Sequence, residues 1–246
     1  IDYFGAGSSD ECDCDEASKE FVSYSTFASL TLEICDRLGV GKMIPFGSLQ
    51  GASGAIELAW LAAKQGRVDR LVLFEALYLS PTAKAYIDNV FIPSLHNLPV
   101  YANGSHLLRW WFSADAGPIG PSSQSPVAAD LAANQQKTID DLTIMATGWQ
   151  FKMAWSGYNE LIVPRFQNLA RAGVKTLFID AGYADYIFNT YGLDKNWSET
   201  HINEAIPPAQ RKIVTIANAT QGALQQNATQ MASAVCDFLG GWPVHQ

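Results

Sequence analysis

Hydrophobic residues recur at the period of an α-helix in several segments of the chain. In residues 25–38, Phe27, Leu30 and Ile34 fall on one face, and Gly39 then provides a residue type that commonly ends a helix. The same period predicts three further helices. They cover residues 52–65, 165–172 and 229–239.

Short, continuously apolar runs lie between these periodic segments and predict buried strands. The runs cover residues 43–46, 68–76, 175–180 and 212–217. Strands that alternate with helices along a chain pair in parallel, and the connecting helices cover the faces of the sheet. The pattern therefore predicts an α/β fold with a mostly parallel sheet and helices on both faces.

The middle of the chain has a different composition from the segments on either side. Residues 80–165 hold seven of the eleven prolines, counting Pro164, and include a stretch rich in Gly, Pro and Ser at residues 116–126. Most of the tryptophans also lie in this part: Trp110, Trp111, Trp149 and Trp155. We expect this part to form a unit distinct from the strand–helix alternation around it.

Composition and charge exclude several classes of protein. The 246 residues are 48% hydrophobic, which suffices for a buried core and rules out intrinsic disorder. The most apolar stretches are shorter than the roughly 20 residues that cross a bilayer, so we expect no membrane span. A net charge of −8 with scattered basic residues argues against nucleic acid as a partner. No grouping of His or Cys fits a metal site, and we expect neither a metal nor a cofactor.

Four Asn-x-Ser/Thr sequons point to the secretory pathway. They begin at Asn103, Asn196, Asn218 and Asn227. Chance predicts roughly one or two such matches in this chain, and glycosylated acceptors lie on secreted surfaces. We therefore expect a secreted glycoprotein.

The four cysteines allow two readings. Their even number permits two disulfides, but Cys12 and Cys14 are too close in sequence to pair easily, so each would need a distant partner. In the alternative reading, Cys35 and Cys236 lie in apolar helical stretches and are buried free thiols.

The order of motifs along the chain resembles the α/β-hydrolase fold family. Residues 2–10 (DYFGAGSSD) look like the loop after the fourth strand of that family, and residues 38–52 resemble the next strand and its nucleophile elbow. Residues 181–185 (AGYAD) look like the loop that carries the catalytic acid. The resemblance implies a core made of residues 1–80 and 165–246, with residues 81–164 as an inserted helical cap.

The elbow lacks a nucleophile in the register that the resemblance favours. The frame Gly-x-nucleophile-x-Gly falls on residues 47–51 (GSLQG), and its centre is Leu49, which cannot attack a carbonyl. Ser48 lies one position early. A rival register centres on Ser53, but it would place four extra residues between the strand and the turn.

The catalytic base is also replaced. The resemblance puts the histidine of the triad at Gln221, which cannot accept a proton at neutral pH, and leaves Asp185 as the one triad member in place. His96 and His106 lie in the cap, His201 in the loop before the last strand, and His245 near the C-terminal end. With both nucleophile and base substituted, we expect no ordinary Ser hydrolysis.

The pocket itself need not be lost with the triad. The backbone N–H of Gln50, beside Ser48 at the start of a helix, would offer a site for an anion or a carbonyl oxygen. Cap aromatics are predicted to line an apolar cavity for a small apolar ligand: Trp110, Trp111, Trp149 and Trp155. The alternative is that these aromatics only pack the cap onto the core.

The resemblance also predicts a missing part. The family has eight strands, and the four strand segments found here match the last four, so the N-terminal strands are absent from this chain. The strand at residues 43–46 would be central in the whole sheet, and a bare apolar edge there favours aggregation. We therefore expect a second polypeptide, to which Cys12 or Cys14 could be bridged, to supply the missing strands.

Three functional hypotheses remain open. The first is a secreted pseudoenzyme that binds a small apolar ligand. The second is an enzyme of the same fold, an esterase, acyltransferase, lyase or cyclase, that uses Ser53 or other pocket groups. The third is a subunit of a two-chain assembly whose partner carries the activity.

Overall fold

The structure is a computed structural model of the whole chain. It describes residues 23–48, 50–76, 78, 80–86, 89, 159–181, 195–217, 219 and 227–240. The helices are α1 (Tyr24–Arg37), α2 (Gln50–Ala63), α3 (Pro81–Tyr86), α9 (Asn159–Arg171), α11 (Lys195–Ala205) and α13 (Ala228–Leu239), with a 3-10 turn at Pro208–Gln210. The strands are β1 (Phe46–Ser48), β2 (Arg70–Phe74), β3 (Lys175–Ala181) and β4 (Arg211–Ile216).

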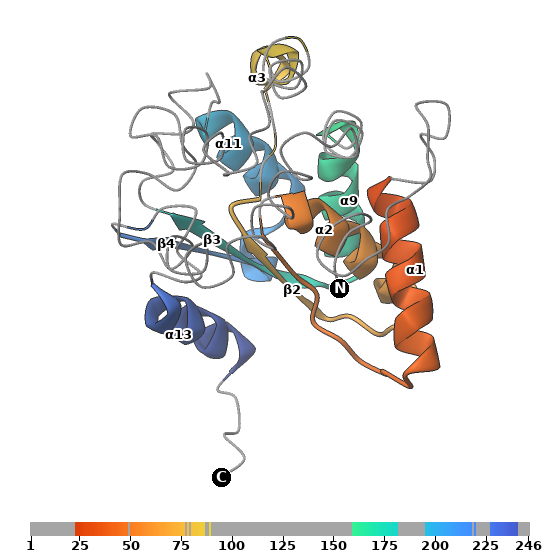
Figure 1. Cartoon of the computed structure of the whole chain (residues 1–246). Coiled ribbons are helices and arrows are strands. Elements are labelled where there is room, and N and C mark those ends of the chain that lie inside the picture. The colour runs from red at the N-terminus through yellow and green to blue at the C-terminus, as the bar shows by residue number, and fades with distance from the viewer. Residues whose placement is uncertain are drawn as a thin grey trace, which may run out of the picture.

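The four strands form one parallel sheet in the order β1-β2-β3-β4. In Figure 1, α2, α9 and α11 lie on one face of this sheet, with α1 packed outside α2, and α13 lies on the opposite face. This arrangement confirms the predicted parallel sheet with helices on both faces. It also brings the carboxyl ends of β1, β2 and β3 to the same edge of the sheet, where ligand sites of open α/β sheets form.

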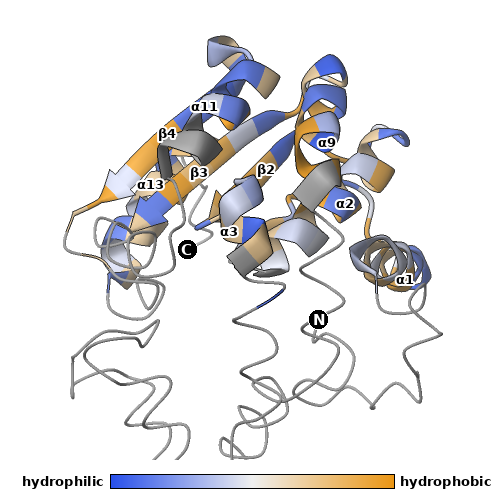
Figure 2. Cartoon of the chain, turned by 90° about the horizontal axis from the view of Figure 1, so that it is seen from above, coloured by the Kyte–Doolittle hydropathy of each residue, from blue (hydrophilic) through white to orange (hydrophobic). Residues whose placement is uncertain are grey.

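The core lies between the sheet and the layer formed by α2 and α9. β2 contributes Leu71 and Leu73, which are fully buried, and α9 contributes Phe166, whose ring meets Phe178 of β3 edge to face at 5.4 Å. α2 faces the sheet with small side chains, which let its backbone approach closely: Ala52, Ala55, Ala59 and Ala62. Figure 2 shows the hydrophobic strands lying between helices whose outer faces are hydrophilic.

Local signals explain where several elements begin and end. α1 begins after Ser23, whose Oγ accepts a hydrogen bond from Thr26 N at 3.1 Å. α13 ends at Gly240, which has φ +82° in the left-handed region. Arg70 at the start of β2 donates to the Leu239 carbonyl at 2.8 Å and so ties the end of α13 to the sheet.

Several of the sequence predictions differ from the structure. The strand predicted at residues 43–46 is observed at Phe46–Ser48, because only these residues pair with β2. The helix predicted from residue 165 begins at Asn159 and contains Pro164, which donates no backbone hydrogen bond within the helix. His201, predicted in a loop, lies in α11.

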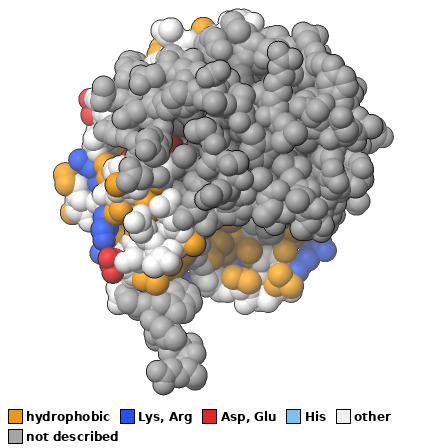
Figure 3. Space-filling view, turned by 60° about the vertical axis from the view of Figure 1, so that its left-hand side comes forward, with side chains coloured by type: hydrophobic (Ala, Val, Ile, Leu, Met, Phe, Trp, Pro, Cys, Tyr) orange, Lys and Arg blue, Asp and Glu red, His pale blue; other side chains and the backbone are white. Residues whose placement is uncertain are grey.

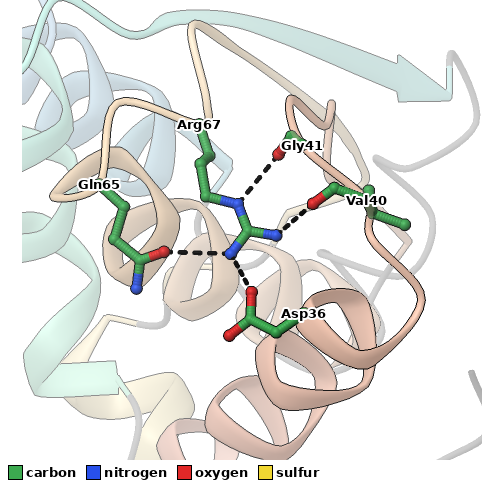
Figure 4. A network of polar contacts seen from close by, with 5 residues as sticks. All are labelled: Asp36, Val40, Gly41, Gln65 and Arg67. Carbon is green, nitrogen blue, oxygen red and sulfur yellow. Dashed lines mark hydrogen bonds and ion pairs between the residues drawn. The ribbon is translucent and has the colours of Figure 1, made fainter.

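A cluster around Arg67 holds the loop before β1 in place (Figure 4). Its guanidinium donates to the carbonyls of Gly41 at 2.9 Å and Val40 at 2.5 Å, and to Gln65 Oε1 at 3.0 Å. It also pairs with the carboxylate of Asp36 in α1. The cluster therefore joins the end of α1 to the α2–β2 connection, and it sets where β1 enters the sheet.

A buried charge joins three helices. Glu57 of α2 is 1% exposed, and its carboxylate accepts from Arg165 Nε of α9 at 2.5 Å and from Ser25 Oγ of α1 at 3.0 Å. The guanidinium of Arg165 also lies 5.6 Å from the ring centroid of Trp60. This contact set fixes α2, and therefore its N-terminal end, relative to α1 and α9.

Candidate functional site

The candidate site begins at the tight connection between β1 and α2. β1 ends at Ser48 and α2 begins at Gln50, so position 49 alone separates strand from helix. A Cβ on Gly47 would lie 2.6 Å from Ala52 Cα and 2.7 Å from Ala55 Cβ, and it would also meet the Gly51 carbonyl. Only glycine fits here, because the helix turns back directly onto the strand. This is the geometry of a strand-to-helix elbow.

The predicted elbow residues take different places around this turn. Ser48 is the last residue of β1 and is half-buried. Gln50 is the first residue of α2, so its backbone N–H is among the four at the helix start that lack intrahelical partners. Ser53 lies inside α2 with 6% of its surface exposed, away from the turn between strand and helix.

A buried carboxylate lies at the next strand end. Glu75 directly follows β2, is 4% exposed, and has φ +50°, which makes it the only residue other than glycine with positive φ in the described part of the chain. Its side chain accepts a hydrogen bond from the N–H of Ala181, the last residue of β3. A left-handed conformation costs such a residue about 1–2 kcal/mol.

Comparisons with known proteins agree with this geometry. No family model matches the sequence, and no curated protein matches it. An α/β hydrolase enzyme from a Medee basin deep-sea metagenome library has a TM-score of 0.64 and 16% identity, over 100% of this chain and 80% of that one. A 2-hydroxy-6-oxo-6-phenylhexa-2,4-dienoate hydrolase from Rhodococcus sp. strain RHA1 has a TM-score of 0.66 and 11% identity, over 98% and 78%. The chain has the α/β-hydrolase fold. MenH from S. aureus is similar as well, with a TM-score of 0.60 and 15% identity over 98% and 82%.

Most of the other predicted site residues lie outside the part that the structure describes. Position 49 directly follows β1, which is the elbow strand of the α/β-hydrolase fold, and the predicted acid loop follows Ala181 at the end of β3. The residues outside the described part are Leu49, Asp185, Gln221, Trp110, Trp111, Trp149, Trp155, Asn103 and Asn218. The predicted cap is described only at its two ends, in α3 and the first residues of α9.

Sequence reasoning missed two residues near the strand ends of this α/β-hydrolase fold. Glu75 was included in the predicted strand at residues 68–76, although a charged residue directly after the apolar run 71–74 was a signal for the end of the strand. His201 of α11 meets Tyr78, which follows β2, edge to face at 5.4 Å. No sequence pattern links residues so far apart along the chain.

The structure describes two of the four cysteines and two of the four sequon asparagines. Cys35 and Cys236 are free thiols, and Cys236 is exposed, which corrects the reading of both as buried. Asn227 directly precedes α13, with its Nδ2 3.5 Å from Gln230 Oε1, and Asn196 lies in the first turn of α11.

Two kinds of feature are absent from the described residues. They contain no group of three His, Cys, Asp or Glu side chains placed to hold a metal ion. Within the same residues, no helix is long and apolar enough to cross a membrane.

Proposed function

We propose that this protein is a secreted glycoprotein of the α/β-hydrolase fold that binds a small apolar ligand without ordinary hydrolysis. Its sequence has Leu49 at the elbow and Gln221 where the resemblance to the family puts the histidine. Leucine has no nucleophilic atom, and the amide of glutamine does not take up a proton near neutral pH. Asp185 would be the remaining triad member.

The observation that carries the proposal is the single position between β1 and α2. Gly47 has no room for a side chain against Ala52 and Ala55, so the first turns of α2 pack directly on the end of β1. A register centred on Ser53 would need that residue in the turn, whereas it lies inside α2. The geometry therefore supports position 49 as the tip of the elbow.

Binding without hydrolysis uses what remains at the elbow. The N-terminal end of α2 presents backbone N–H groups, and the positive end of the helix dipole favours a carbonyl oxygen or an anion there. An ester or ketone with an apolar body would combine this polar contact with the apolar cavity predicted under the cap. The ligand would then be held but not cleaved.

Repairing the triad tests the proposal directly. The double variant Leu49→Ser with Gln221→His should gain hydrolysis of 4-nitrophenyl butyrate and labelling by a fluorophosphonate probe at residue 49. The wild-type protein should show neither. A triad member contributes a rate factor of about 10³ or more, so the gain should be well above background.

The matched control is Leu49→Ala with Gln221→His, which has the base but no nucleophile and should stay silent. Probe labelling of the wild-type protein at Ser53 or Ser48 would contradict the proposal and favour an esterase or acyltransferase. Loss of that activity in Ser53→Ala would identify the nucleophile. The burial of Ser53 argues against this second reading.

Secretion and glycosylation form a separate part of the proposal. Asn227 lies at the start of α13, and its side chain is only partly buried, which supports glycan access. Expression in a eukaryotic secretory host should give protein in the medium whose mass falls after treatment with an N-glycosidase. Asn227→Gln should remove one glycan. An unchanged mass after the enzyme would exclude glycosylation in that host.

We also propose that a second polypeptide supplies strands that pair with β1. β1 is an edge of the described sheet, and it exposes Phe46 by 47%, with Ile44 just before it also exposed. The outer side of α1 adds apolar surface at Leu30 and Ile34. An exposed apolar edge strand is normally paired or covered, so these residues support a strand donor.

The opposite edge provides a matched control. β4 is the other edge of the described sheet and exposes Ile213. β4 lies on the left-hand side of Figure 1, and Figure 3 brings that side forward and shows hydrophobic side chains at the surface beside Lys and Arg. In the producing cells, Phe46→Lys should lose a co-purifying polypeptide that Ile213→Lys retains. A monomeric species of only 26.8 kDa plus glycans in the wild type would refute the second polypeptide.

A further inference from the structure

The proposed function leaves one buried charge at the strand ends unexplained. Glu75 combines a left-handed backbone with a buried carboxylate, and both features lie at the carboxyl edge of the sheet. Residues with strained backbones persist where the surrounding structure holds them, and they concentrate at functional sites. The strain is therefore a reason to ask what the Glu75 side chain does.

The register of the sheet shows which hydrogen-bond acceptor the Glu75 side chain replaces. In a parallel pair, the N–H and the carbonyl of one residue bond to the residues before and after its partner. The Glu75 N–H donates to the Ile179 carbonyl at 3.0 Å, so the ladder would next bring the Ala181 N–H to the Glu75 carbonyl. The Ala181 N–H donates to Glu75 Oε1. The side chain therefore takes the place of its own carbonyl.

This exchange lets β2 end while β3 remains held. The positive φ of Glu75 turns the backbone out of the ladder, toward Tyr78 and α3. The carboxylate meanwhile keeps the last N–H of β3 satisfied at a buried position, where an unpaired amide would be costly. Asp185 follows Ala181 by four positions in the sequence.

We propose that Glu75 is a positioning residue of the candidate site. Its carboxylate holds the N–H of Ala181 and so fixes the carboxyl end of β3 beside the end of β2. The inference rests on the proposed function only in taking the carboxyl ends of β1, β2 and β3 as part of the ligand site. The role requires an acceptor atom at the end of this side chain, and it does not require the negative charge.

Two variants separate the acceptor from the backbone strain. Glu75→Gln keeps an acceptor oxygen, the side-chain length and the left-handed cost. Glu75→Gly removes the acceptor and relieves that cost, so it should fold. The measurements on the full chain are amide exchange by NMR at Ala181, with Leu177 in the middle of β3 as an internal reference, and the thermal shift produced by phenyl butyrate.

In Glu75→Gly, loss of one buried hydrogen bond should speed exchange at Ala181 by about tenfold and weaken phenyl butyrate binding by a similar factor, with Leu177 unchanged. Glu75→Gln should restore both to within about threefold of the wild type, because its amide oxygen still accepts. Amide shifts of residues 182–185 should move in the Gly variant and return in the Gln variant.

Slow exchange at Ala181 in Glu75→Gly would overturn the proposal, and so would equal losses in the Gln and Gly variants. If phenyl butyrate gives no thermal shift with the wild-type protein, the proposed ligand class fails. The exchange and shift measurements at residues 181–185 still decide the role of Glu75, so the two failures can be told apart.

Discussion

Glu57 and Glu75 are both buried carboxylates, but they lie in two regions of the molecule and differ in backbone conformation and in the groups that they contact. Glu57, in the helical layer, sits in an ordinary helix and faces the cation of Arg165 together with the hydroxyl of Ser25. Glu75, at the carboxyl edge of the sheet, has a left-handed backbone and accepts from the neutral amide of Ala181. The first arrangement joins helices without backbone strain. The second accepts strain to place one side chain at a strand end.

The difference separates structural polar groups from candidate functional ones. The ion pair of Glu57 with Arg165, together with the hydrogen bond from Ser25, has a structural role because it connects three helices. The carboxylate of Glu75 instead links the ends of two strands, and its position beside the elbow connects it with the site. The comparison can be tested by removing each feature in turn.

The largest expected effect comes from the helical layer. Glu57→Ala should lower the free energy of unfolding by about 3–5 kcal/mol, because it removes the buried carboxylate and leaves the partly buried guanidinium of Arg165 and the hydroxyl of Ser25 without this acceptor. Urea unfolding followed by circular dichroism measures the change. The paired replacement Glu57→Leu with Arg165→Met removes both charges and should cost much less, or nothing. A small effect of Glu57→Ala alone would contradict the structural role that the comparison gives to Glu57.

The next effect comes from the elbow. Gly47→Ala should lower the free energy of unfolding by about 3 kcal/mol, because the new methyl group meets the backbone of Ala52 and the side chain of Ala55. The control Gly51→Ala lies in α2 with open space around its Cβ, and it should be neutral or stabilise by up to about 1 kcal/mol. Equal melting temperatures for the two variants would mean that α2 does not press on β1.

The smallest expected effect comes from an exposed ion pair, which tests whether burial decides how much such a pair stabilises the fold. Arg37 and Glu33 form an ion pair in α1 at 2.5 Å, with side chains 78% and 54% exposed. Arg37→Ala should change the free energy of unfolding by no more than about 0.5 kcal/mol, and added salt should reduce even that. An effect as large as that of Glu57→Ala would show that geometry rather than burial decides the strength of these pairs.

Periodicity predicted much of the core, because the apolar faces of the elements are local patterns. The helical period of α1 placed it within one residue at each end, and the apolar run at residues 175–180 matched β3. The alternation of strands and helices also predicted the parallel sheet. In these segments, local preference and tertiary burial favour the same structure.

The errors arose where tertiary pairing decides the outcome. β1 begins at Phe46 because pairing with β2 starts there, although the apolar run begins at Met43. The helix predicted to start at residue 165 starts at Asn159, and Pro164 lies inside it. The role of Glu75 depends on Ala181, 106 positions further along the chain, and a single sequence contains no record of that contact. The Gly47 elbow was predictable because its partners are local.

The tie between Arg70 and the Leu239 carbonyl has a consequence for synthesis. The two residues are 169 positions apart, so a ribosome that adds roughly 5–20 residues per second finishes β2 many seconds before it makes α13. During that interval the Leu239 carbonyl that Arg70 binds does not yet exist, and α13 does not yet cover its face of the sheet. The nascent chain therefore completes this layer only after α13 has been made, and until then this face of the sheet lacks its covering helix.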